Sequence, residues 1–272
     1  MPALCMLLVG CSSSNHVLED PQRTPVGSNI LPQKDAEPKV RTDIFLILEN
    51  DHPNIGEFND LIRSGVDLNE RHSNGMTPLM YAAARCQNPE VIESMISAGA
   101  DLESRSDLGS TALMIAASLN DNPEIHRVFL DQGANVNARD DAGLTALAIA
   151  SGETMDPNVV RLLIEAGSDI ESRDRIGLTP IFYAVANNPN PKVTSVLIEA
   201  DASVEIALPN GLTPLMMAAA RSTRPLIIEL LLNAGADIRR TDAMGRNGMT
   251  YLLQNPSLSE SDVVQLLQVP KP

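Results

Sequence analysis

The stretch TPLMYAAA, residues 77–84, returns four times in this chain with small changes. The later copies are TALMIAAS from residue 111, TALAIASG from 145, TPIFYAVA from 179 and TPLMMAAA from 213. Each copy begins 34 residues after the one before it. A motif that returns at a fixed period of about 20–50 residues is typical of an array of stacked units, in which each unit buries its apolar face only against its neighbours.

The residues around this motif predict two short helices in each unit. Thr77 and its counterparts are suited to cap a first helix, and a proline follows several of them at the first helical position. A second helix is predicted to begin at an Asx-Pro pair, because Asx is a favoured cap and proline a favoured first residue. These pairs are Asn88-Pro89, Asn122-Pro123, Asp156-Pro157 and Asn190-Pro191.

Two sets of glycines predict the turns. The first set lies two residues before the threonine, where a tight turn needs positive φ: Gly75, Gly109, Gly143, Gly177, Gly211 and Gly245. The second set closes the second helix in the left-handed conformation: Gly65, Gly99, Gly133, Gly167 and Gly235. Asp201 takes this place in one unit, and because Asp tolerates it less well than Gly, we predict that Asp201→Gly raises the melting temperature.

A unit of loop, helix, turn, helix and closing glycine, with TPLxxAA in its first helix, resembles the ankyrin repeat. The segments GADLES, GANVNA, GSDIES and GADIRR resemble the end of that repeat, and the resemblance covers residues 43 to about 268. The period of 34 differs from the family's usual 33 residues. The family's histidine after Thr-Pro-Leu is also replaced, so apolar contacts are expected in place of its polar bonding. The replacing residues are Met80, Met114, Ala148, Phe182 and Met216.

The resemblance implies an all-α solenoid of stacked helix-turn-helix units with β-hairpin-like loops. About seven units are expected over residues 42–272, including two degenerate caps. They are the N-terminal cap repeat 42–76, the full repeats 77–110, 111–144, 145–178, 179–212 and 213–246, and the C-terminal cap repeat 247–272. In this family the hairpin loops and first helices line a concave face on which protein partners dock.

The composition argues against several classes of function. The 272 residues carry a formal net charge of -15, and aromatic residues make up only 3% of them. Nucleic-acid binding needs a basic surface and usually aromatic side chains for unpaired bases. Docking on anionic lipid needs basic clusters as well. We therefore expect neither kind of partner.

No catalytic or metal-binding pattern stands out in the sequence. Three scattered cysteines, Cys5, Cys11 and Cys86, make neither a disulfide framework nor a zinc site, and the histidines lack a ligand spacing. The chain has no nucleophile elbow, phosphate-binding glycine loop or Cys-His couple. We expect no enzyme activity, no cofactor, no metal and no small-molecule substrate.

The first forty residues differ from the array. Residues 3–10 form a short apolar run that closes with LVGC at Cys11, and small polar residues follow. This resembles a bacterial lipoprotein signal peptide, which implies a signal peptide over residues 1–10, a lipid on Cys11 and a flexible tether over residues 11–41. The implied location is the periplasmic side of the bacterial envelope. No Lys or Arg precedes the run, so a soluble cytosolic or secreted protein without a lipid remains the alternative.

Three apolar ladders recur on the side of the predicted hairpin loops and first helices. The first ladder is Tyr81, Ile115, Ile149, Tyr183 and Met217; the second is Leu144, Leu178 and Leu212; the third, at the hairpin tips, is Leu108, Ala142, Ile176 and Met244. Exposed apolar groups along one groove favour a contact surface. We predict that eight of these residues bind the partner: Leu108, Leu144, Ile176, Leu178, Leu212, Tyr81, Tyr183 and Met244. The alternatives are a buried spine for the first ladder and hairpin-to-hairpin contacts for the other two.

A fourth row is basic and consists of Arg71, Arg105, Arg139 and Arg173. Acidic residues flank it, and we interpret it as a solvated ladder of mixed charge. The alternative is a strip that reads an acidic peptide. Together the patterns predict a monomeric, non-catalytic module that binds a protein partner on its concave face, either anchored by a lipid or as a soluble scaffold or effector.

Overall fold

The described part of the chain is a stack of helix pairs. The computed structural model describes residues 44–48 and 54–258. These residues lie in the second of the two units into which the chain divides, residues 42–272. They contain thirteen helices, and within those ranges no strand is formed.

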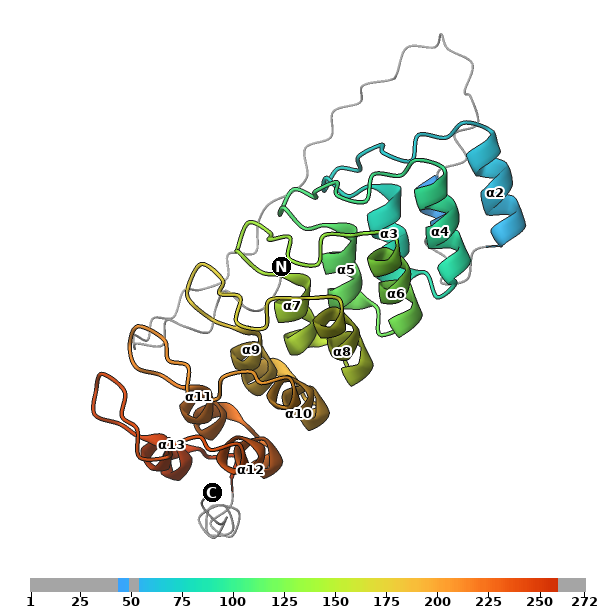
Figure 1. The fold of residues 1–272 in the computed structure, drawn as a ribbon. Coiled ribbons are helices and arrows are strands. Elements are labelled where there is room, and N and C mark those ends of the chain that lie inside the picture. Colours follow the sequence, from blue (N-terminus) through green and yellow to red (C-terminus); the bar gives the residue numbers. More distant parts are fainter. Residues whose placement is uncertain (1–43, 49–53, 259–272) are drawn as a thin grey trace, which may run out of the picture. The chain divides into compact units, whose positions relative to one another are not determined.

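The helices alternate along the chain between two rows. The first helices of the units are α1 (Ile44–Leu48), α3 (Pro78–Arg85), α5 (Ala112–Leu119), α7 (Ala146–Glu153), α9 (Pro180–Asn187), α11 (Pro214–Arg221) and α13 (Gly248–Gln254). The second helices are α2 (Ile55–Arg63), α4 (Pro89–Ser97), α6 (Pro123–Asp131), α8 (Pro157–Glu165), α10 (Pro191–Glu199) and α12 (Pro225–Asn233). Each helix contacts its counterpart in the next unit, and from α3 to α12 each first helix also contacts its own second helix. Figure 1 shows the two rows, with the long loops that join the units projecting beyond one end of the helices.

The helices begin where the capping residues predict. In three units the threonine side chain accepts a hydrogen bond from the amide three residues on; these are Thr111, Thr145 and Thr213. In four second helices an Asx side chain accepts a bond from the amide two residues on, and proline fills the first position. The predicted Asx-Pro starts are therefore confirmed. The exception is α12, whose cap position holds Arg224 and makes no side-chain cap bond.

Small and apolar side chains of the first helices fill the space between the units. The paired alanines are buried, among them Ala82, Ala83, Ala116, Ala117, Ala218 and Ala219. The five residues at the place of the family's histidine are buried as well: Met80, Met114, Ala148, Phe182 and Met216. Apolar contacts therefore replace polar bonding at this position, as predicted. Alanine permits close approach of neighbouring helices, and the larger side chains fill the remaining volume to the density that a protein core requires.

Each second helix from α2 to α12 is followed by a residue in the left-handed conformation. The five predicted glycines have φ between 81° and 98°. Asp201 has φ of 64° and is the one residue other than glycine with positive φ in the described ranges. A Cβ in this conformation approaches the following carbonyl oxygen, which is the reason glycine is preferred there.

Replacing Asp201 by glycine is expected to raise the melting temperature. Removal of the Cβ from a left-handed residue relieves about 1 kcal/mol, because Asp tolerates this conformation only in part. For a domain of this size that gain corresponds to a rise of roughly 2–4 °C, measurable by thermal unfolding. The neighbouring change Ala200→Gly is the control. Ala200 has φ of -95°, so glycine there only adds freedom to the unfolded chain and the melting temperature should fall. A rise in both variants would contradict the explanation.

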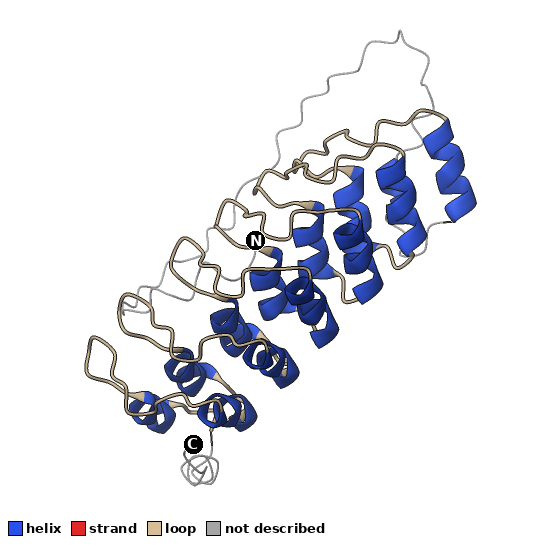
Figure 2. Ribbon diagram, viewed as in Figure 1, coloured by secondary structure: helices blue, strands red, loops and turns tan. Residues whose placement is uncertain are grey.

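Six loops precede the first helices from α3 to α13, and each contains one tight turn. The amide of the first loop residue donates to the carbonyl of the fifth, as from Asp140 to Leu144 at 3.0 Å. We call these loops the hairpins: residues 72–76, 106–110, 140–144, 174–178, 208–212 and 242–246. The predicted hairpin-like turns are therefore present, although Figure 2 shows them as loops. The described residues contain one isolated antiparallel bridge, between Thr241 and Asn247.

The predicted features of the N-terminal segment lie outside the described residues. These are the signal peptide over residues 1–10, the lipidation site Cys11 and the tether over residues 11–41. They stay predictions, as do the domain boundaries. Within residues 44–48 and 54–258, no helix has the length and apolar character needed to cross a membrane.

A buried histidine in α6 makes the stability of the stack depend on pH. His126 is fully buried, and its Nδ1 donates to the Asn122 carbonyl at 3.0 Å. Its Nε2 has no hydrogen-bond partner among the described residues. Burial lowers the pKa of His126, and this effect outweighs the nearby backbone carbonyls and the charges of Asp121 and Asp156, which raise it.

Acidification through pH 6 is therefore expected to destabilise the protein. The unfolded chain takes up a proton at His126 near its ordinary pKa of about 6.5, while the folded chain resists it until a lower pH. Stability is unaffected by this group above pH 6.5 and falls as the pH drops below that value, by at most about 1.4 kcal/mol per pH unit. Urea unfolding at pH 7.5 and 5.5 should show a smaller loss in His126→Val, which carries the residue found at the equivalent position 160.

Candidate binding surface

The hairpins form an edge in which backbone bonds join neighbouring tips at four of the five junctions. Four such bonds run from a tip amide to the carbonyl of the preceding tip: Asp107 to Asn74 (3.4 Å), Asp141 to Leu108 (3.1 Å), Arg175 to Ala142 (3.0 Å) and Ala243 to Asn210 (2.8 Å). Each bond satisfies two groups of an exposed loop and holds neighbouring hairpins in a common orientation. Side chains at the tips are therefore presented from a fixed support.

Every second hairpin tip carries a large, exposed apolar side chain. Leu108 is 64% exposed, Ile176 is 53% exposed and Met244 is 75% exposed. The tips between them carry Asn74, Ala142 and Asn210. The three apolar tips are therefore two units apart, which is about 16–20 Å if neighbouring helices pack 8–10 Å apart. A regular row of separate, exposed apolar side chains offers spaced anchor points on one edge of the stack.

The second predicted ladder is only partly accessible. Leu144 and Leu212 are half-buried, whereas Leu178 is buried with 7% exposure, so the expectation of an exposed groove residue was wrong for Leu178. The reason lies in the next hairpin, which begins with Leu208 in place of a polar residue. Leu208 and Pro209 lie against Gly177, beside Leu178.

Some residues of the first ladder are accessible, as a binding surface requires, and others form a buried spine. Tyr81 is half-buried, while Tyr183 is 4% exposed and Met217 is also buried. For Tyr183 and Met217 the buried-spine alternative is correct, so Tyr183 is not an accessible binding residue. The hydroxyl of Tyr183 donates to the carboxylate of Asp174 in the hairpin of its own unit. This contact turns the ring inward, and burial together with Asp174 raises the pKa of Tyr183.

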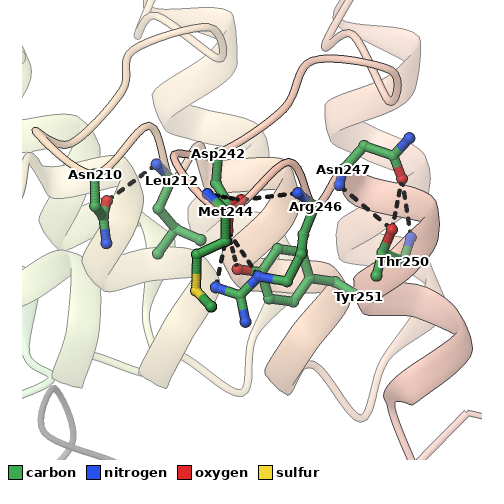
Figure 3. Close-up of polar contacts among 8 residues, drawn as sticks. All are labelled: Asn210, Leu212, Asp242, Met244, Arg246, Asn247, Thr250 and Tyr251. Carbon is green, nitrogen blue, oxygen red and sulfur yellow. Dashed lines mark hydrogen bonds and ion pairs between the residues drawn. The ribbon is translucent and has the colours of Figure 1, made fainter.

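The same contact recurs at the last hairpin, where Figure 3 shows its geometry. The Tyr251 hydroxyl donates to Asp242 Oδ2 at 2.7 Å, and the Arg246 guanidinium donates to the same oxygen at 2.9 Å. Asp242 Oδ1 accepts the amides of Met244 and Arg246, each at 2.9 Å. Burial acts to raise the pKa of Asp242, but these hydrogen bonds outweigh it and lower the value to about 2. Burial and Asp242 also raise the pKa of Tyr251 to about 12, so near neutral pH the tyrosine stays a donor and the aspartate an acceptor.

Comparison with known proteins identifies the family. The family model described as ankyrin repeats, in three copies, matches residues 82–174 and 147–242. The chain is an ankyrin-repeat protein. Among solved structures, it is similar to the crystal structure of the ankyrin repeat domain of Bcl-3, described as a unique member of the IkappaB protein family. The TM-score is 0.64 and the identity 26%, over 84% of this chain and 98% of that chain. No curated protein matches the chain.

Ankyrin repeats indicate that this chain is a protein-protein interaction module. Stacked repeats produce an extended surface in which each unit adds a similar patch, and partners of such arrays bind along that surface.

The arginine row of this ankyrin-repeat protein is exposed, as predicted, but two of its members bond the backbone of the next repeat and do not pair with the flanking acids. Arg105 Nη1 donates to the Gly109 carbonyl at 2.9 Å and to the Arg139 carbonyl, one unit further on, at 2.6 Å. Arg139 likewise donates to the Gly143 carbonyl of its own unit and to the Arg173 carbonyl of the next unit. Only Arg71 makes an ion pair of the expected kind, at 3.4 Å from Asp107. A guanidinium has five donors, so one arginine can bond two backbone carbonyls that belong to neighbouring repeats.

A row of Asn and Glu side chains also joins the repeats, a role that was not predicted from the sequence. The side-chain oxygen of each accepts the backbone amide 32 residues on, as in Asn69 from Asp101 and Glu103 from Asn135, both at 2.7 Å. The row consists of Asn69, Glu103, Asn137, Glu171 and Glu205. These residues recur every 34 positions and each carries a side-chain oxygen that can accept a hydrogen bond. That pattern in the sequence could have predicted a bond between repeats.

Three buried asparagines form a second missed set, at the ends of alternate first helices. The side-chain amide of each donates to two carbonyls of the preceding repeat. They are Asn120, Asn188 and Asn255. The repeats between them carry a smaller residue at this place: Cys86, Thr154 and Ser222. The large apolar tips and these asparagines thus both follow a period of two repeats.

The described residues contain no group of three or more side chains suited to hold a metal ion. Cys86 is buried at the end of α3, and its Sγ lies 3.4 Å from the Asn88 carbonyl. Burial raises the pKa of the Cys86 thiol more than this bond lowers it, which keeps the sulfur protonated and weakly nucleophilic. Cys86 is a small residue whose backbone carbonyl accepts a hydrogen bond from Asn120 of the next repeat.

Proposed function

We propose that this ankyrin-repeat protein is a non-catalytic, monomeric module that captures one protein partner along the hairpin edge and the concave face behind it. The observation that carries the proposal is the row of exposed apolar tips, Leu108, Ile176 and Met244, on hairpins whose tips are joined by backbone bonds at every junction but one. Half-buried Leu144, Leu212 and Tyr81 lie behind the tips and add apolar area. Apolar anchors on a preformed support favour binding because little conformational entropy is lost when the partner docks.

The buried members of the predicted set have a supporting part in this proposal. Tyr183 in α9 bonds Asp174 and so ties the hairpin to its own helix, and Leu178 of the same hairpin is buried. Their replacement would change the fold as well as binding, so it does not test the surface. The three tips do test it, because each is exposed and its side chain has no structural partner to lose.

The test is a triple variant with Leu108, Ile176 and Met244 all changed to serine. Protein complexes are captured from the native source with wild type and variant as bait, and the captured partner is quantified by mass spectrometry. We expect at least about a tenfold loss of the partner, since each buried apolar anchor contributes more than 1 kcal/mol at a typical hot spot. Circular dichroism should show unchanged helix content.

A matched control changes two exposed apolar residues away from the hairpins. Met155 lies in the turn between α7 and α8, and Leu226 lies on the outer face of α12. The double variant Met155→Ser, Leu226→Ser should retain capture. Retained capture by the folded triple variant, or equal loss in the control, would remove the hairpin edge as the binding surface.

We also propose that the protein is anchored by a lipid on Cys11 at the periplasmic side of a bacterial envelope. Support comes from the apolar residues 3–10, the LVGC box and the small polar residues that follow it. Mass spectrometry of the N-terminus, after expression in a bacterial host, should find a diacylglyceryl group on Cys11 that Cys11→Ser lacks. An unmodified chain that retains residues 1–10 would favour the alternative, a soluble ankyrin scaffold or effector.

A further inference from the structure

The connections between neighbouring hairpins are regular except at one place. The tips of the first three hairpins, 72–76, 106–110 and 140–144, each accept a backbone bond from the next tip. Hairpin 208–212 is likewise joined to hairpin 242–246, by the bond from Ala243 to Asn210. Between hairpin 174–178 and hairpin 208–212 no such bond forms, since the residue that would donate is Pro209, which has no N–H.

The arginine connection is interrupted at the same place. Arg105 and Arg139 each reach the backbone of the following repeat, whereas Arg173 bonds only the Gly177 carbonyl of its own hairpin, at 3.3 Å. Deeper in the loop the repeats remain joined, because Glu171 accepts the Ser203 amide at 2.7 Å. The interruption is therefore confined to the hairpin tips, and we call it the tip seam: residues 173–176 on one side and 206–210 on the other.

The tip seam leaves hydrogen-bonding groups without a partner inside the described part of the chain. The Ile176 carbonyl accepts no bond there, although Leu108 and Ala142 at equivalent tips each accept one. The exposed Arg175 guanidinium makes no hydrogen bond or ion pair with any described residue, and Arg173 retains most of its donors. Arg173 and Arg175 are exposed beside Ile176, whose side chain is exposed and whose carbonyl has no hydrogen-bond partner among the described residues.

No carboxylate at the tip seam is available to neutralise these arginines. Asp174, the acid of this hairpin, has Oδ1 occupied by the amides of Ile176 and Leu178 and Oδ2 by the Tyr183 hydroxyl. The facing segment, residues 206–210, reads IALPN and carries no charge. Asp141 occupies the equivalent tip position in the preceding hairpin but makes no ion pair with Arg175.

We propose that the tip seam binds an extended segment of the partner protein that carries an Asp or Glu next to an apolar residue. The partner's carboxylate accepts hydrogen bonds from Arg173 and Arg175, whose planar donors match its two oxygens. Its apolar side chain covers Ile176 and Pro209. A backbone amide of the segment donates to the Ile176 carbonyl and replaces the bond that Pro209 cannot make. This inference rests on the proposed function and names the chemistry of the partner at one place on the same surface.

The net charge of the whole chain limits how acidic such a partner can be. With a formal charge of -15, the protein repels a strongly acidic chain at long range. The seam therefore favours a segment with a single carboxylate among apolar and neutral residues. Recognition of such a segment depends on how the planar N–H donors of the arginines meet the carboxylate, more than on the electrostatic field of the whole protein.

The test uses the full chain and capped hexapeptides as probes, followed by NMR of the Arg Nε–H groups and the isoleucine methyl groups. The peptides GSELSG, GSQLSG and GSKLSG differ only at the residue before leucine. We expect GSELSG to shift the signals of Arg173, Arg175 and Ile176 in a saturable way at millimolar concentration. GSQLSG should bind at least about fivefold more weakly, because the charge-assisted bonds are lost. GSKLSG should not bind at all.

Two variants separate the parts of the proposal. Arg173→Gln should weaken GSELSG binding at least about fivefold, while the control Arg239→Gln, an exposed arginine outside the hairpins, should not change it. Pro209→Asp restores the amide that Asp141 provides at an equivalent tip, so it should close the seam, protect the residue-209 amide from hydrogen exchange and weaken the peptide.

Three results would overturn the inference. They are equal shifts with GSKLSG, shifts confined to other hairpins, and no shift at the seam with any peptide. If capture of the native partner fails in the triple tip variant but survives Arg173→Gln, the proposed function stands and the seam assignment fails. If capture survives the triple variant, the proposed function itself fails, whatever the peptides do.

Discussion

Asn188→Ala is expected to lower the free energy of unfolding by about 3 kcal/mol, because two backbone carbonyls and one amide lose a buried hydrogen-bond partner. The Asn188 Nδ2 donates to the carbonyls of Ser151 and Thr154, at 3.0 and 2.9 Å, and its Oδ1 accepts the Asn190 amide at 2.8 Å. The side chain is only 4% exposed, so water cannot replace these bonds without entering the stack. Urea unfolding followed by circular dichroism measures the loss.

The control for this prediction is Asn233→Ala at the exposed end of α12. Asn233 makes no side-chain hydrogen bond to a described residue, and the change should alter stability by no more than about 0.5 kcal/mol. Because stacked repeats unfold through their interfaces, Asn188→Ala should also make the transition less cooperative, separating the repeats on its two sides. Equal losses in the two variants would show that the inter-repeat amide contributes nothing.

Gly109→Ala is expected to cost about 3 kcal/mol, from backbone strain and a steric clash together. Gly109 has φ of 76°, and a Cβ there would lie 2.7 Å from Asp141 Oδ1 and 2.9 Å from the Asp141 amide nitrogen. The neighbouring hairpin must move away, which breaks the bond from Asp141 to the Leu108 carbonyl. Unfolding in urea gives the energy, and faster hydrogen exchange of the Asp141 amide identifies the cause.

Gly133→Ala is the matched control, because it makes the same change at a similar backbone angle. Gly133 has φ of 84°, and an added Cβ would meet nothing within 4 Å. Only the strain of the left-handed conformation remains, at about 1 kcal/mol. If both alanine variants lost the same stability, the close approach of neighbouring hairpins would have no energetic consequence.

The repeat and its helices could be predicted from the sequence because the determinants are local. Asn88 caps α4 because its side-chain oxygen accepts the backbone amide two residues further on. Pro89, which has no N–H, is compatible with a helix only in its first turn. Asp201 adopts the conformation that its glycine counterparts indicate. These preferences act within a few residues, so a period of 34 repeats them faithfully and makes the register unambiguous.

The binding surface was predicted only in part, because exposure depends on the neighbouring repeat. Leu108, Ile176 and Met244 are exposed as predicted, although partner binding by them stays a prediction. Leu178 and Tyr183 share the period of exposed residues but are buried. A periodic sequence shows which positions are equivalent in the fold. The solvent exposure of each position depends on the side chains of the next unit, which differ from one repeat to another.

The sequence by itself determined the ankyrin-type unit, its helix ends and its left-handed turns, since backbone preferences and caps act at short range. Tertiary structure alone decided the role of the polar rows. Arg105 bonds a carbonyl 34 residues away and Asn188 bonds one 37 residues away, so their partners exist only after stacking. The same holds for the tip seam. Pro209 can be read from the sequence. That it interrupts a row of hydrogen bonds is visible only in the tertiary structure, where the other neighbouring tips are joined.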